Sequence, residues 1–140
     1  MNRITRITVT TLAVTGLALG LGACSEAADE AAKQVDKAVN EKYEVTYEVT
    51  GKNVDSIGFH GGEGDGMEPK IETVEKPTLP WKKTVTLRGI MPPAVMPAAA
   101  DLTGAEVTCK ITYKGEVIKE ESAEGLATAG GCVAVSPIAD

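Results

Sequence analysis

Three cysteines are the side chains in this 140-residue sequence that most readily carry chemistry. Cys24 stands alone where a hydrophobic run gives way to the acidic stretch SEAADE, whereas Cys109 and Cys132 both lie in the last third of the chain. A thiolate can form a disulfide, bind a metal or act as a nucleophile. The single histidine, His60, has no serine or cysteine nucleophile motif beside it, so we do not expect an enzyme. The odd count instead suggests one cysteine with its own role and one pair.

The segment that ends at Cys24 has the order of a bacterial export signal. Two arginines precede a nearly uncharged run over residues 7–21, and Leu21-Gly22-Ala23-Cys24 resembles the lipobox of bacterial lipoproteins. The apolar run is shorter than the roughly 20 residues that a membrane-spanning helix needs. We therefore predict that residues 1–23 are a cleaved lipoprotein signal peptide and that Cys24 is lipidated, because two or more acyl chains hold a protein stably on a bilayer. The alternative is an ordinary signal or an uncleaved anchor with an incidental cysteine.

The other two cysteines form an even pair in a chain destined for an oxidising compartment. We predict a disulfide between Cys109 and Cys132, which ties two strands through or beside the core. Closing a loop of this length stabilises a fold by roughly 3 kcal/mol in the chain-entropy model. A metal site made from this pair and His60 would lack a fourth ligand. The sequence therefore predicts neither a metal nor a cofactor.

The charge of the chain excludes one class of partner. Removing the two arginines of the signal leaves 12 of the 14 basic residues against 20 acidic ones, a net charge of about −8. Such a chain has no basic patch to neutralise phosphates, so we expect no nucleic-acid binding. An acidic body is also repelled by an anionic lipid surface.

The composition divides the mature chain into a tether and a domain. Residues 24–41 are rich in Ala, Glu and Lys with small apolar residues three and four apart, which predicts a helix that acts as a semi-rigid spacer. Residues 42–140 switch to a period of two, clearest in YEVTYEVT at 43–50. Further strands are expected at about 54–60, 71–75, 84–87, 107–113, 116–121 and 128–135.

These short strands, separated by turns, predict an all-β fold: an antiparallel β-sandwich of about seven strands. The segment RGIMPPAVMPAAADLTG at 88–104 holds three prolines, so we expect an irregular connection or a broken edge strand there. Lys114 and Gly115 suit a tight hairpin turn.

The order of several motifs carries a family resemblance. YEVTYEVTG, SIGFHGGEGDG, PTLPWKKTVTL and GAEVTCKITYKGEVIKEESAEG follow one another and precede a final cysteine. This arrangement, over about residues 43–133, resembles the mycobacterial membrane protein small (MmpS) family. Two features depart from that family: a lipobox stands where an uncleaved membrane helix is usual, and a Pro- and Met-rich segment at 91–97 interrupts a region that is usually more regular.

The resemblance implies an immunoglobulin-like sandwich with a disulfide, located at the outer face of the cytoplasmic membrane. It also implies a role as accessory to an MmpL-type transporter of the RND superfamily, which exports lipids or siderophores. A second function from another class stays open: a stand-alone lipoprotein that holds a small apolar or siderophore-like molecule in a pocket beside Trp81.

Four apolar residues are candidates for a partner or ligand surface. Met91, Val95 and Met96 belong to the stretch MPPAVMPAAA, which could form an exposed apolar loop, and Trp81 could stack on a ligand. The alternative for each is ordinary packing, because a sandwich with a single indole needs that residue for buried area. Binding of cuprous ion by the two thioethers lacks a neighbouring cysteine or histidine motif.

Overall fold

The computed structural model describes residues 23–64, 68–101, 103–125 and 130–139. The chain divides into two units, residues 1–33 and 34–140, and all the strands belong to the second. The signal segment expected at 1–23 lies almost entirely outside the described residues.

Helix α1 runs from Ala23 to Asn40, close to the range that the sequence predicts. From residue 26 to residue 37 its side chains are exposed, since alanine and charged residues offer little apolar area to bury. The helix ends where the amide of Glu41 donates to the carbonyl of Lys37, 2.8 Å away. Gly89 then fits closely against this end, because a Cβ at that position would lie 2.4 Å from the carbonyl oxygen of Val39.

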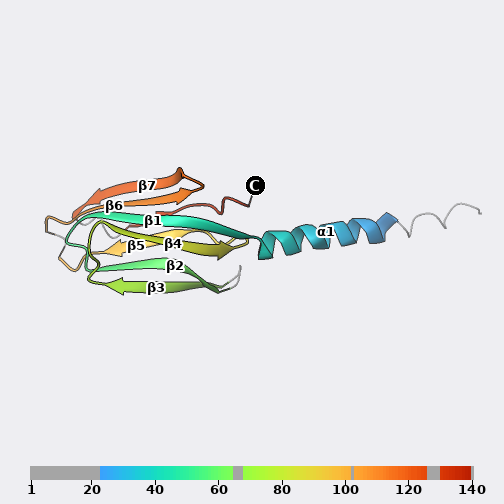
Figure 1. Ribbon diagram of the computed structural model, residues 1–140, viewed down its shortest axis with the longest axis horizontal. Helices are drawn as coiled ribbons and strands as arrows, with labels where there is room; N and C mark the ends of the chain where they lie inside the picture. The colour runs from blue at the N-terminus through green and yellow to red at the C-terminus, as the bar shows by residue number, and fades with distance from the viewer. Residues whose placement is uncertain (1–22, 65–67, 102, 126–129, 140) are drawn as a thin grey trace, which may run out of the picture. The chain divides into compact units, whose positions relative to one another are not determined.

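Eight strands in the described part of the chain form two antiparallel sheets (Figure 1). We name them sheet A and sheet B. Sheet A has the order β4 (Trp81–Arg88), β1 (Lys42–Lys52), β6 (Glu106–Tyr113), β7 (Glu116–Glu124). Sheet B has the order β3 (Pro69–Glu75), β2 (Ser56–Gly64), β5 (Ala94–Ala98), β8 (Cys132–Val133). This arrangement confirms the all-β sandwich.

The core lies between the two sheets and follows the period of two. In β1 the inward residues Tyr43, Val45, Tyr47 and Val49 are at most 4% exposed, while the outward ones alternate with them. Sheet B contributes its own inward residues, and β2 packs against β4 while β5 packs against β6. The largest fully buried side chains are Tyr47, Phe59, Ile57, Leu87, Met91 and Ile111.

The prediction for residues 88–104 was wrong in one respect. Ala94–Ala98 form β5, which is an inner strand between β2 and β8 rather than an irregular connection or an edge. The carbonyl of Ala98 accepts a hydrogen bond from the amide of Asp55 at 2.9 Å, so the nitrogen of the preceding Pro97 points away from β2. On that side β8 pairs only with Ala94 and Val95. Proline has no amide hydrogen to donate, and at position 97 this loss is on the side where no neighbouring strand that the structure describes would accept a hydrogen bond.

Other strand boundaries also differ from the sequence expectation, since β4 begins three residues earlier and β7 ends three residues later than expected. β2 continues to Gly64, beyond the expected end at residue 60, because its glycines extend the strand instead of beginning a loop. The last strand was expected over 128–135, but the structure describes only Cys132–Val133 as β8, and residues 126–129 lie outside the described residues.

Candidate functional site

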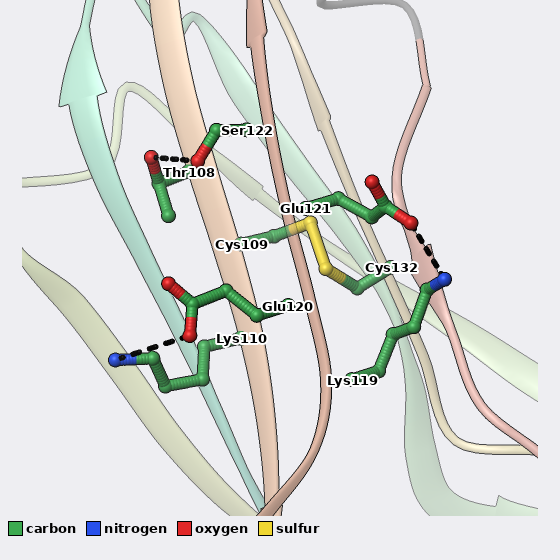
Figure 2. Close-up of a disulfide and its surroundings, with 8 residues drawn as sticks. All are labelled: Thr108, Cys109, Lys110, Lys119, Glu120, Glu121, Ser122 and Cys132. Atoms are coloured by element: carbon green, nitrogen blue, oxygen red, sulfur yellow. Dashed lines mark hydrogen bonds and ion pairs between the residues drawn. A yellow bond between two sulfur atoms is a disulfide. The ribbon is translucent and has the colours of Figure 1, made fainter.

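The disulfide joins the two sheets of the sandwich. Cys109 of β6 is bonded to Cys132 of β8, with their Cα atoms 5.9 Å apart. Both residues are buried, at 3% and 0% exposure. Figure 2 shows this bond beside the β6–β7 hairpin, where Thr108 and Ser122 share a hydrogen bond of 2.9 Å. Since β8 pairs with only two residues of β5, the covalent bond is what fixes this short strand to sheet A.

Two of the expected surface residues belong to the core. Met91 is 1% exposed and Val95 is fully buried. The hydroxyl of Tyr43 donates a hydrogen bond to the backbone oxygen of Met91, which fixes this segment against β1. The expectation of an exposed loop is therefore wrong for these two side chains, because both belong to the hydrophobic core.

Trp81 packs at the rim of the core. It is half-buried, and its ring centroid lies 5.2 Å from that of Phe59 with the two planes tilted by 48°. Phe59 in turn contacts Tyr47, at a centroid distance of 5.9 Å. The indole thus supplies buried area and aromatic contacts, the alternative that the sequence left open.

Met96 is the candidate residue that reaches the surface. Its neighbours in β5 face inward, but Met96 faces outward from sheet B and is 37% exposed. Ile71 of β3 and Val133 of β8 are exposed on the same sheet, at 57% and 53%. A Cβ added to Gly58 would lie 3.8 Å from Cγ2 of Ile71 and 3.9 Å from Cε of Met96, so these two side chains flank the glycine. We call Ile71, Met96 and Val133 the sheet B patch.

The outer face of sheet A has the opposite chemistry. The hydroxyls of Thr46 and Thr84 share a hydrogen bond of 2.9 Å. Ion pairs join neighbouring strands, with Lys82 Nζ 3.8 Å from Glu48 Oε2 and Lys110 Nζ 3.9 Å from Glu120 Oε2. A face of hydroxyls and paired charges stays solvated, whereas exposed apolar side chains gathered on one face indicate an interaction surface.

A small polar network connects Tyr47 of sheet A with β2 and β5 of sheet B. The hydroxyl of Tyr47 donates to the carbonyl of His60 at 3.0 Å and accepts from the amide of Ala94 at 3.3 Å. Burial raises the pKa of this hydroxyl well above its ordinary value. His60 Nδ1 donates to the carbonyl of Pro92 at 2.7 Å, so the histidine holds the segment that leads into β5. Within the described residues there is no group of three His, Cys, Asp or Glu that could hold a metal ion.

A cleft of about 330 Å³ opens beside the disulfide. Its apolar lining comes from β5 and β6, and its polar lining comes from β7. The residues around it include Pro97, Val107, Cys109, Glu121, Ser122 and Ala123. Trp81 does not line this cleft, so the cleft is not the pocket beside Trp81 that the sequence analysis considered.

Sequence analysis did not identify Ile71 and Val133, because the sequence does not distinguish an exposed apolar residue in a strand from a buried one. The only signal was Gly58, which predicts a close neighbour but does not say which one. Cys24 lies in the first turn of α1, and its lipidation stays a prediction.

A family model described as Mycobacterium membrane protein matches residues 3–137. No curated protein matches the chain. Among the helices that the structure describes, none is both long and apolar enough to cross a membrane.

Proposed function

The chain belongs to the Mycobacterium membrane protein family, known as MmpS, and from this premise we propose that it is an interaction module that serves an MmpL-type exporter of the RND superfamily. Family membership associates the chain with a membrane. The finer proposal is that Cys24 carries a lipid, that the domain stands at the outer face of the cytoplasmic membrane, and that the exported molecule is a lipid or a siderophore.

The sheet B patch is the observation that carries this proposal. Ile71, Met96 and Val133 remain exposed together on one face, while the outer face of sheet A carries hydroxyls and ion pairs and the exposed valine Val117. The core of a protein interface is depleted of charge, and methionine adapts its shape to a partner surface. We assign the patch to the contact with the exporter.

The tether supports the same assignment. Between residues 26 and 37 the side chains of α1 are exposed, so this part of the helix is not held by a hydrophobic core. A helix of 18 residues extends about 27 Å at 1.5 Å per residue. The net charge of the mature chain, near −8, opposes close approach of the domain to anionic lipid. A lipidated Cys24 would therefore hold the domain near the membrane with its patch available.

Co-purification tests the contact. The full chain carries an affinity tag, membranes are solubilised in mild detergent, and proteins recovered with it are identified by mass spectrometry. We expect an RND-type exporter with the wild type, and at least a tenfold lower yield with Val133→Glu, because a buried unpaired carboxylate costs several kcal/mol.

Val117→Glu is the matched control for this experiment. Val117 is a valine of similar exposure, 46% against 53% for Val133, but it lies on β7 of sheet A. It should leave the yield of exporter unchanged. Equal losses with both variants would refute the assignment to sheet B, and recovery of the wild-type chain without any exporter would refute the proposed partnership.

The cleft beside the disulfide favours the second function, a ligand-binding lipoprotein. Its volume of about 330 Å³ lies at the lower end of the range for small-molecule sites. Native mass spectrometry of the protein incubated with an apolar lipid extract, and separately with an iron-free siderophore, measures the binding. Ala123→Trp places an indole at the cleft, so it should abolish any adduct that the cleft holds. An adduct that survives this substitution excludes the cleft as its site.

A further inference from the structure

The two edges of sheet A carry opposite charge. β4 forms one edge and has three basic residues and no acid: Lys82, Lys83 and Arg88. β7 forms the other edge and has four acids: Glu116, Glu120, Glu121 and Glu124. Its one base, Lys119, is paired with Glu121 at 2.6 Å. Each edge is thus complementary to the other and repels its own kind.

The charges also alternate across the sheet in a single row. Lys82 of β4 lies opposite Glu48 of β1, and Glu48 lies opposite Lys110 of β6. Lys110 lies opposite Glu120 of β7, and its Nζ is 3.9 Å from Glu120 Oε2. The row begins with a base at one edge and ends with an acid at the other, so a second sheet placed beside it would continue the alternation.

We propose that a second copy of this chain pairs with the first edge to edge, with β7 of one copy against β4 of the next. Glu120 then stands beside Lys82 of the second copy and extends the row of charges. The same register places Lys119 opposite Lys83, and Glu121 offsets this like pair because it is ion-paired with Lys119. All neighbouring strands in sheet A are antiparallel, so β4 and β7, three steps apart, run in opposite directions. A copy in the same orientation therefore presents its β4 antiparallel to β7, which allows an ordinary ladder of backbone hydrogen bonds.

The free part of each edge fits this pairing. Among the described residues, no strand pairs with the outer side of β4 or β7. One end of β4 is covered, because a Cβ added to Gly62 would lie 2.6 Å from the carbonyl oxygen of Thr86. The half that begins at Trp81 and holds Lys82 and Lys83 is the part that remains. Charges on edge strands usually prevent pairing, and here they prevent only the pairing of like edges.

The interface is heterologous, because it joins two different surfaces of the same chain. Each added copy leaves one β4 and one β7 unpaired at the ends, so the association extends with concentration or closes into a ring. This pairing uses neither the sheet B patch nor Cys24, and it is independent of the function proposed above.

Charge reversal tests the proposal. One variant carries Lys82→Glu with Lys83→Glu, so that both of its edges are acidic. The other carries Glu120→Lys with Glu121→Lys, so that both of its edges are basic. Sedimentation equilibrium of the full chain in density-matched detergent measures association. We expect each variant alone to associate at least tenfold more weakly than the wild type, and an equimolar mixture to recover the association.

Salt and a control variant complete the test. Wild-type association should weaken as salt rises from about 0.05 to 0.5 M, because exposed ion pairs are screened. Val133→Glu on sheet B should associate as the wild type does. A wild type that stays monomeric at low salt, or a mixture that associates no better than its components, would overturn the proposal.

Cross-linking keeps the test valid where a reversed variant does not fold. Wild-type copies with and without ¹⁵N are mixed and treated with a carbodiimide, which joins carboxylates to amines that are in contact. Peptides that link Glu120 to Lys82 should carry one labelled and one unlabelled half. Finding only links within one copy, such as Glu120 to Lys110, contradicts the edge pairing.

Discussion

Reduction of the disulfide is the perturbation whose effect follows most directly from the structure. Cys109 and Cys132 are separated by 23 residues, and closing a loop of that length removes about 3.4 kcal/mol of chain entropy from the unfolded state at 25 °C. For a domain of about 100 residues, 1 kcal/mol corresponds to roughly 4–8 °C in Tm. We therefore expect reduction to lower Tm by about 15 to 25 °C.

Two perturbations separate the entropy of the loop from packing. A phosphine reductant breaks the bond and keeps both sulfur atoms, whereas Cys109→Ala with Cys132→Ala also removes two buried sulfurs. Thermal and denaturant unfolding of the full chain, followed by circular dichroism, measure both. The double variant should lose slightly more stability, and the denaturant slope m should rise in both cases because the unfolded chain expands.

A small change in Tm on reduction would contradict this prediction. A fall in Tm of less than about 5 °C, with free thiols confirmed by labelling, would mean that the bond does not constrain the unfolded chain as the loop model requires. Two free thiols in the untreated mature protein would remove the disulfide altogether. Cys24→Ala is the control, and it should leave Tm unchanged.

Three shorter predictions follow. Cys24→Ala should move the protein from the membrane fraction to the soluble fraction, and metabolic lipid labelling that persists in this variant would contradict the lipid anchor. Tyr47→Phe should cost about 1–3 kcal/mol of stability by denaturant unfolding, because the carbonyl of His60 and the amide of Ala94 lose a buried partner; an unchanged midpoint would contradict it. Burial raises the pKa of Tyr47 and of Tyr43, so the stability that these neutral hydroxyls contribute is complete below about pH 10 and is lost as pH rises above it. The alkaline loss in Tm should be smaller in Tyr47→Phe than in the wild type, and an equal loss would refute this assignment.

The alternation in β1 shows what could be predicted from local sequence. Every second residue from Tyr43 to Val49 is apolar, and each of them is buried. The signal is strong there because the strand has one face on the core and one in water. The same reasoning found the sandwich, since it depends only on which side of a strand each residue faces.

β5 shows why the same reasoning fails elsewhere. The segment at 88–104 that contains it has three prolines, and β5 itself shows no alternation of polar and apolar side chains, because Met96 and its neighbours are apolar on both faces. A proline fits at position 97 only because β8 is short: β8 pairs with Ala94 and Val95 and does not extend alongside Pro97. The residues around Pro97 give no information about the length of a strand that begins 35 residues later, so this fit could not be predicted from local sequence.

The sheet B patch could not be predicted from the sequence for a related reason. Ile71, Met96 and Val133 come from three strands, and only the pairing of those strands brings them onto one face. The charges of the two edges could be recognised from the sequence, since it shows both the basic run in WKK and the acids of β7. Their meaning depends on the strand order, because β4 and β7 become complementary edges only when β1 and β6 lie between them.

The two proposed surfaces rely on different physics, and salt distinguishes them. Contact through the sheet B patch comes from apolar burial, which salt does not screen, whereas pairing through the edges of sheet A comes from exposed charges, which salt does screen. Raising the salt during purification should therefore separate copies of this chain from one another while the exporter is retained. Loss of the exporter at the same salt as loss of self-association would mean that the partner reads the charged edges instead of the patch. The Lys82/Lys83 reversal would then lower exporter recovery while Val133→Glu would not, which is the opposite of what the proposed separation of the two surfaces predicts.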